Sequence, residues 1–198
     1  MKIDKGRVYD MAESIKASGY PMSEDADLDV DMKRAEKLAH VPAGSGHDCY
    51  LKGIVVNVDV TAPQYWWMQF QRYHFSDIVS SQSKMHRITK MDIEDQCNDY
   101  VLPSTIKTVQ ELVDYYNNFD DLKKSGEIAY KDKEELFQVI VSNCPMGLML
   151  TARITTNYLQ LKSMYNQRKS HKLEEWRVFC EWIESLPKSH LITGKEMG

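Results

Sequence analysis

The sequence has little glycine, no paired cysteines and no long apolar run. It holds nine glycines in 198 residues, and the run Gly44-Ser45-Gly46 is too short for a phosphate-binding loop and lacks its following Lys-Ser/Thr. No apolar stretch reaches the roughly 18 residues needed to span a bilayer, and residues 1–10 lack the apolar core of a signal peptide. The four cysteines are widely separated, without a CxxC pair, which favours reduced thiols. We therefore expect a cytoplasmic protein without a membrane segment.

The chain also lacks an excess of positive charge. It carries 25 Lys+Arg against 29 Asp+Glu, a formal net charge of -4, so its charge gives no direct evidence for nucleic-acid binding. Hydrophobic residues at 42% and charged residues at 27% are ordinary globular values, which exclude a disordered or collagen-like chain. The length predicts one domain over residues 1–198: N-terminal helices at 1–40, a core at 41–186 and a tail at 187–198.

Hydrophobic periodicity predicts an α+β fold that is mostly helical, with a small antiparallel or mixed sheet. Residues 53–61 are the clearest strand, because valines alternate with polar residues there. Pro63 is typical of the first turn of a helix, Ser104 of a helix cap, and Asp132 with Glu135 of a capping box. We expect helices at 1–19, 20–40, 63–73, 104–116, 132–143, 146–171 and 173–186, loops at 41–46, 76–83 and 117–127, and a loose tail after Pro187.

Two polar segments are candidates for function. Residues 69–87 combine several serines with Gln82, Lys84, His86 and Arg87, which offer many hydrogen-bond donors for a phosphate or a base edge. The alternative is a solvated polar loop with serine caps. No adjacent set of His, Cys, Asp or Glu has metal-ligand spacing, so we predict no metal site.

The second candidate is the helix expected around residues 151–171. Arg153, Asn157, Arg168 and His171 would lie in one stripe about 27 Å long at 1.5 Å per residue, because an 11-residue step returns to nearly the same face. Such a stripe would line an anion-binding cleft with Arg168 as a bidentate donor. The alternative is a solvated face with scattered charges.

The spacing of short motifs in both segments resembles that of the flavin-dependent thymidylate synthase family. Ser45-Gly46-His47 matches the family's Ser-Gly-His, and the following Glu-His pair falls on Lys52-Gly53. The family's Arg-His-Arg triplet falls on Tyr73-His74-Phe75, and its closing Ser-rich run on Ser81-Gln82-Ser83-Lys84-Met85. Further along, the family has an Asn and an Arg eleven residues apart, which fall on Asn157 and Arg168.

The resemblance covers roughly residues 40–185 and implies the family's fold, FAD as a cofactor, a pyrimidine nucleotide such as dUMP as substrate, and a homotetramer. It implies flavin contacts at His74, Asn157 and His171, and substrate contacts at Ser83, Arg168, Gln82 and Arg87. Tyr73, Phe75 and Met85 stand where the family has arginines. The rings of Tyr73 and Phe75 could stack on a flavin or a base, but they cannot pair with a pyrophosphate, and Met85 removes a contact to a nucleotide phosphate.

Three hypotheses remain open. The chain is a divergent flavin-dependent methyltransferase or oxidoreductase of nucleotide metabolism, a non-catalytic nucleotide-binding or phage–host interaction protein, or a protein that keeps the fold for assembly alone. Residues 71–87 are also similar to segments of uncharacterised bacteriophage and prophage proteins.

Overall fold

The computed structural model describes residues 1–42 and 45–195. Ala43 and Gly44, from the loop expected at 41–46, and residues 196–198 of the expected tail lie outside the described residues. The strands are β1 (Lys2–Tyr9), β2 (Val55–Pro63), β3 (Asp77–Ser81) and β4 (Met149–Asn157), and the 3-10 turns are η1 (Tyr20–Met22), η2 (Cys49–Lys52) and η3 (Ile88–Lys90). The helices are α1 (Met11–Ala17), α2 (Met32–Ala39), α3 (Gln64–Phe70), α4 (Lys84–Arg87), α5 (Ile93–Gln96), α6 (Pro103–Ser125), α7 (Lys133–Asn143), α8 (Tyr158–Arg168), α9 (Glu174–Glu184) and α10 (His190–Thr193).

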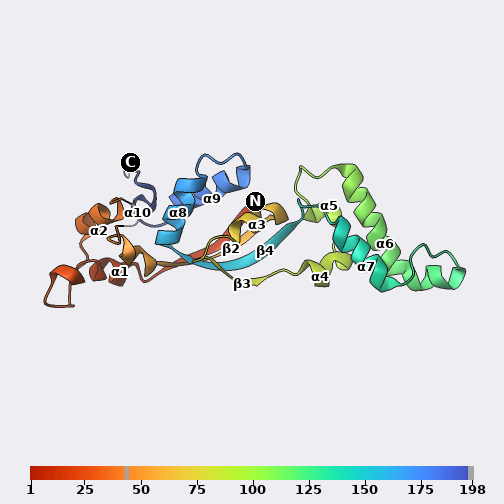
Figure 1. The fold of residues 1–198 in the computed structure, drawn as a ribbon, viewed down its shortest axis with the longest axis horizontal. Coiled ribbons are helices and arrows are strands. Elements are labelled where there is room, and N and C mark those ends of the chain that lie inside the picture. The colour runs from red at the N-terminus through yellow and green to blue at the C-terminus, as the bar shows by residue number, and fades with distance from the viewer. Residues whose placement is uncertain (43–44, 196–198) are drawn as a thin grey trace. The chain divides into compact units, whose positions relative to one another are not determined.

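The strands form one four-stranded antiparallel sheet in the order β1-β2-β4-β3 (Figure 1). Helices make up the larger part of the chain, so the predicted α+β class with a small sheet is confirmed. In β2, Val56, Val58 and Val60 are fully buried and alternate with half-buried residues, as their spacing predicts. No helix among the described residues is long and apolar enough to cross a membrane.

The chain divides into two compact units. Unit 1 comprises Met1–Val60, Phe70–Ser80 and Arg153–Gly198, and unit 2 comprises Thr61–Gln69 and Ser81–Ala152. Because β2 and β4 cross these boundaries, each of the two strands contributes residues to both units.

Unit 2 is built on a helical core. Its long helix α6 packs against α7, and both contribute to one apolar cluster. The buried members of this cluster are Ile88, Met91, Ile93, Val109, Val113, Phe119, Leu136, Ile140 and Leu148. The expected capping box opens α7, since Glu135 N–H donates to Asp132 Oδ1 at 2.8 Å.

The helix expected at 104–116 begins earlier and ends later. Leu102 occupies the cap position, with Pro103 as the first helical residue, so Ser104 is not the cap. The helix then continues through the loop expected at 117–127, because Phe119 extends its buried face. It ends at Gly126, whose φ of 79° is left-handed.

The N-terminal prediction of a helix over 1–19 is wrong for its first half. Residues 2–9 pair with β2 as an edge strand, and the helix begins only at Met11. Asp10 has a φ of 59°, a left-handed conformation that separates the strand from the helix. The second helix is also shorter than predicted: Asp31 caps α2 by accepting from Arg34 N–H at 3.0 Å, and the acidic residues before it are not in an α-helix.

The helix predicted over 146–171 is also wrong in its first half. Residues 149–157 form β4, where Ala152, Ile154 and Thr156 are buried in alternation. Tertiary pairing between two neighbouring strands decides this segment, which is rich in β-branched residues that fit a pleated surface. Residues 77–81, part of the loop expected at 76–83, form the edge strand β3 for the same reason.

Three helix ends also differ from expectation. Pro63 is the last residue of β2 rather than the first of α3, and Tyr73 lies beyond the end of that helix. The tail expected to be loose after Pro187 forms α10, whose Leu191 and Ile192 are buried in unit 1. Apolar burial therefore orders a segment whose sequence lacks a periodic pattern long enough to predict a helix.

Candidate functional site

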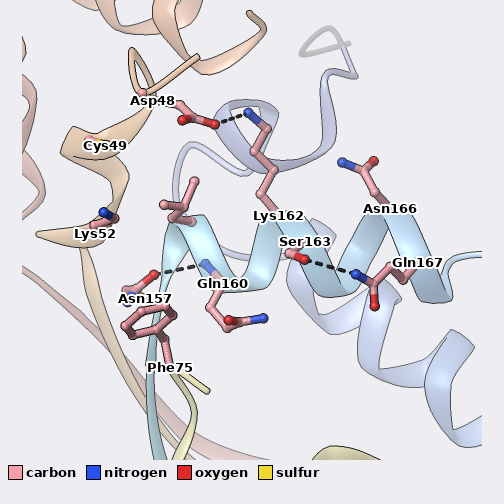
Figure 2. Close-up of a pocket in the computed structure, with 12 residues that line it drawn as sticks. Asp48, Cys49, Lys52, Phe75, Asn157, Gln160, Lys162, Ser163, Asn166 and Gln167 are labelled. Carbon is pink, nitrogen blue, oxygen red and sulfur yellow. Dashed lines mark hydrogen bonds and ion pairs between the residues drawn. The ribbon is translucent and has the colours of Figure 1, made fainter. Parts of the chain in front are cut away.

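Unit 1 contains a cavity of about 580 Å³ between α8 and the turn at η2. Figure 2 shows the side chains that line it, mostly on α8 and the residues around η2. They are Gly46, Asp48, Cys49, Lys52, Phe75, Asn157, Leu159, Gln160, Lys162, Ser163, Asn166 and Gln167. Its size is within the usual range of small-molecule sites.

The α8 wall of the cavity is polar because of how the helix starts and repeats. Asn157 is the helix cap, and its Oδ1 accepts from Gln160 N–H at 2.9 Å. Gln160, Ser163 and Gln167 follow at steps of three and four, so they share one face of the helix. Gln167 Nε2 donates to Ser163 Oγ at 3.2 Å. This wall therefore presents amide and hydroxyl groups, which can both donate and accept.

An ion pair joins the two walls. Lys162 Nζ lies 2.7 Å from Asp48 Oδ2 (Figure 2). It also donates to the Ala39 carbonyl at 2.5 Å. The side chains of Lys162 and Asp48 are only 13% and 8% exposed. This contact connects α8 to η2 and to the end of α2. A charge removed from water to this degree must be paired to be tolerated.

Phe75 closes the cavity from the segment before β3. Its carbonyl accepts from Thr156 Oγ1 at 2.9 Å, and the buried Ser76 hydroxyl also bonds Thr156 Oγ1 at 2.9 Å. These contacts fix the backbone, yet the Phe75 residue is 62% exposed. Phe75 and Asn157 also line a shallower cavity of about 170 Å³ beside β4. An exposed ring on a fixed backbone beside a cavity is suited to stacking on a planar ligand.

Arg168 lies at the end of α8, in an aromatic cluster rather than among the cavity-lining residues. Its Nε donates to the Tyr73 hydroxyl at 2.8 Å, and its guanidinium carbon lies 4.6 Å from the centre of the Trp176 ring. The Tyr73 hydroxyl in turn donates to Gln167 Oε1 at 3.1 Å. Arg168 thus contributes to the cavity indirectly, through the cavity-lining Gln167.

His171 belongs to the same cluster. Its ring centre lies 6.5 Å from that of Trp176, and its Nδ1 accepts from Leu173 N–H at 3.1 Å. Partial burial, followed by the positive charge of Arg168, lowers the pKa of His171 below its usual value. His171 is therefore placed here as a neutral hydrogen-bond acceptor.

The other predicted site residues are spread more widely. His74 is an exposed residue before β3 and does not line the cavity. In unit 2, Gln82 exchanges two hydrogen bonds with the Thr151 backbone, at 2.9 and 3.1 Å. Ser83 is the cap residue of the short helix α4 without a side-chain cap bond, and Arg87 is exposed at its end.

The predicted stripe of Arg153, Asn157, Arg168 and His171 does not exist. Arg153 lies on β4, where it donates to Asp59 Oδ1 at 3.0 Å, while Asn157 caps α8. The strand interrupts the helical spacing on which the stripe depends. The hydrogen bond from Arg153 lowers the pKa of the Asp59 carboxyl below its usual value.

Several cavity residues escaped the sequence reasoning. Asp48 and Lys162 are 114 residues apart, and no local pattern connects them. Gln160, Ser163 and Gln167 are spaced to lie on one helix face beginning at the cap Asn157. This could be recognised only once the structure showed that α8 starts at Tyr158. Within residues 1–42 and 45–195, no group of three or more His, Cys, Asp or Glu could hold a metal ion.

The cavity brings together four of the segments that carry the family resemblance. Gly46 comes from the Ser-Gly-His match, Lys52 from the Glu-His position, Phe75 from the triplet and Asn157 from the later motif. Gly46 and Lys52 are neighbours in sequence, but Phe75 and Asn157 are far from them and from each other, so the common location of all four depends on the fold.

Comparisons with known proteins support the same fold. No family model and no curated protein sequence matches the chain. A crystal structure of thymidylate synthase X from Helicobacter pylori with FAD and dUMP is similar with a TM-score of 0.68 and 12% identity, covering 98% of this chain and 96% of that one. A second structure of the flavin-dependent Helicobacter pylori enzyme, complexed with FAD and dUMP, gives 0.63 at 12% identity, covering 98% and 97% of the two chains.

A third similar structure is a UMP/dUMP methylase PolB from Streptomyces cacaoi bound with 5-Br dUMP. Its TM-score is 0.62 at 16% identity, with coverage of 98% of this chain and 95% of that one. All three similarities extend over nearly the whole of both chains. The chain therefore has the fold of the flavin-dependent thymidylate synthases, as its motif spacing predicted.

Proposed function

We propose that this chain is a divergent flavin-dependent thymidylate synthase-like protein that binds FAD and a pyrimidine nucleotide such as dUMP. One observation carries the proposal: Gly46, Lys52, Phe75 and Asn157, from four motif-matched segments, line one cavity. The similar solved structures with FAD and dUMP support it, although a shared fold alone does not establish an activity.

The residues of the cavity fit the ring of a flavin. Phe75 offers an exposed ring for stacking, and the amides of Gln160 and Asn166 can donate to and accept from the edge of an isoalloxazine. The flavin would supply the redox chemistry, and these side chains would hold and orient its ring. His74 and His171 remain predicted flavin contacts.

The proposed nucleotide contacts are Arg168, Ser83, Gln82 and Arg87. Arg168 is already bonded to Tyr73 and does not line the cavity, so we expect it to act on a bound nucleotide through Tyr73 and Gln167 rather than as a ligand of the phosphate. Ser83 and Arg87 are placed with their polar groups available in unit 2. Each is testable by substitution with alanine.

A second candidate function is nucleotide binding without catalysis, including a role in phage–host interaction. The observation that favours it is the loss of family residues. Lys52-Gly53 stands where the family has Glu-His, and Tyr73, Phe75 and Met85 stand where it has arginines. Release of tritium from C5 of labelled dUMP, with a flavin, a reductant and methylenetetrahydrofolate present, would favour the enzyme over this alternative.

The experiment for binding uses the purified chain and FAD. We expect quenching of flavin fluorescence on titration, and weaker quenching for Phe75→Ala and Asn157→Ala. Ile128→Ala is the matched control, because Ile128 is an exposed apolar residue of unit 2 outside the motif-matched segments. Absence of any flavin or dUMP binding would contradict the proposal.

Cys49 provides a second readout of cavity occupancy. It lines the cavity and is exposed, whereas burial raises the pKa of both Cys97 and Cys180 to about 11. Alkylation should therefore be fastest at Cys49, and a bound ligand should slow it. Mass spectrometry of the labelled peptides measures both effects.

We also propose self-association to a homotetramer, a cytoplasmic location and a phage-related origin. The resemblance supports the first, and the widely spaced cysteines support the second. Native mass spectrometry tests the tetramer directly. A monomer at micromolar concentration would contradict it.

A further inference from the structure

The charges around the cavity nearly cancel. The charged side chains that line it are Asp48, Lys52 and Lys162, and the remaining lining residues are neutral at pH 7. Asp48 and Lys162 form a close pair at 2.7 Å, so their charges offset each other within the wall. This leaves Lys52, which is exposed to solvent and screened there.

Lys162 is already engaged on two sides. It donates to Asp48 and to the Ala39 carbonyl, and only 13% of its side chain is exposed. A ligand phosphate would have to compete with a carboxylate that is itself 8% exposed and would lose its partner. The lysine of α8 that lines the cavity is therefore occupied by Asp48 and is not available to hold a phosphate.

Two arginines of unit 1, Arg168 and Arg153, are also engaged. Arg168 donates to Tyr73 and lies over Trp176, and Arg153 is paired with Asp59 at 3.0 Å. Neither arginine lines the cavity. A ligand seated there meets amides, hydroxyls and the Phe75 ring, which recognise an uncharged planar ring rather than an anion.

We propose that this cavity recognises the uncharged heteroaromatic ring of its ligand and gains little affinity from the ligand's phosphates. The inference rests on the proposed flavin or nucleotide binding and specifies which part of the ligand carries recognition. It predicts that riboflavin and FMN, and likewise deoxyuridine and dUMP, bind with similar affinity. An exposed lysine such as Lys52 accounts for a preference of at most about fivefold.

The first test compares dissociation constants within each ligand pair. Riboflavin and FMN are titrated by flavin fluorescence, and deoxyuridine and dUMP by calorimetry, at 50 and 500 mM NaCl. Ratios within about fivefold, with little dependence on salt, support the inference. A larger preference for the phosphorylated member of a pair that binds overturns it and leaves the proposed function intact.

If only the flavins or only the pyrimidine compounds bind, that ring is the ligand of the cavity. The ratio of the two dissociation constants within that pair then decides the inference. Absence of binding by all four ligands rejects the proposed function, and the inference then fails with it. The two kinds of failure are therefore distinguishable.

The second test removes the negative charge of Asp48, which neutralises Lys162. Asp48→Asn keeps a hydrogen-bond acceptor for Lys162 but removes the negative charge, so the lysine becomes available to a phosphate. We expect the preference for FMN over riboflavin to rise by about tenfold. Adding Lys162→Met to Asp48→Asn should abolish the gain. Glu181→Gln, an equal charge change at an exposed position of α9, should leave the ratio unchanged.

A tenfold gain in Asp48→Asn that Lys162→Met reverses supports masking of the lysine by Asp48. An unchanged ratio in Asp48→Asn, with a melting temperature that shows it to be folded, overturns the masking step. If that variant does not fold, the ratios of the parent protein decide the inference alone.

Discussion

The two units of the molecule use their side chains differently. Unit 2 has an apolar cluster made by α6 and α7, and its predicted site residues Gln82, Ser83 and Arg87 lie at or near the surface. Unit 1 instead arranges polar side chains of α8 around a cavity, and supports that helix with the cluster around Trp176. Under the proposed function, unit 1 would carry ring recognition, while the apolar core of unit 2 would serve stability.

The largest expected effects come from the two cores. Trp176→Ala removes a fully buried ring and should lower the free energy of unfolding by about 3–5 kcal/mol, and Leu136→Ala by about 2–5 kcal/mol. Only Trp176→Ala should also weaken flavin binding, because it disturbs the contacts from Arg168 through Tyr73 to Gln167. Urea unfolding and flavin titration measure the two effects. Equal loss of binding in Leu136→Ala would refute the division between the units.

An ion pair in each unit gives the next comparison. Lys162→Met leaves the Asp48 carboxylate buried without its charged partner, which should cost about 3–5 kcal/mol. Lys133→Met in unit 2 breaks a pair with Asp120 that solvent already screens, and should have a far smaller effect. Thermal unfolding of both variants tests the difference. Similar shifts in melting temperature would show that the pair at the cavity is no more important than a surface pair.

Two helix caps should have equal effects on stability but different effects on binding. Asn157 caps α8 and Asp132 caps α7, each by accepting a backbone N–H, so replacement by alanine should cost about 1 kcal/mol in either unit. Asn157→Ala alone should reduce flavin affinity, because Asn157 also lines the cavity. If both variants bind flavin as the parent does, Asn157 acts only as a cap.

Acid sensitivity should be the smallest difference, because both units contain a carboxylate of lowered pKa. The Arg153 hydrogen bond lowers the pKa of Asp59 from 3.8, and the Lys133 hydrogen bond does the same for Asp120. A carboxyl whose pKa is lower in the folded state than its ordinary value of 3.8 stabilises the folded protein fully above pH 3.8. This stabilisation is lost as the pH falls through the pKa of the folded state. Asp59→Asn and Asp120→Asn should therefore be less stable than the parent at pH 7, and the difference should shrink below about pH 4.

Thermal unfolding between pH 2 and 7 measures this dependence. The parent and each variant should converge in melting temperature at the acid end. A difference that stays constant throughout this range would mean that the two carboxylates act through packing rather than charge.

The sequence predicted those parts of the fold in which local signals agree. The valines of β2 alternate so that one face of the strand is buried, and Asp132 accepts the N–H of Glu135 at the start of α7. Both signals are complete within a few residues. β1 and β4 were mistaken for helix, because their extended form depends on pairing with β2, which is far away in the chain. Of the site, Asn157 was predicted and lines the cavity, whereas the spacing that linked it to Arg153 had no structural basis.

The sequence by itself determined the α+β class and the motif spacing that identified the fold. Both depend on residue order, which is fully contained in the chain. Only the tertiary structure decided that Gly46, Lys52, Phe75 and Asn157 share one cavity, and that Asp48 neutralises Lys162. The pairing of Asp48 with Lys162 joins residues 114 positions apart, and the cavity is formed by segments at least as distant in the chain, so local patterns encode neither.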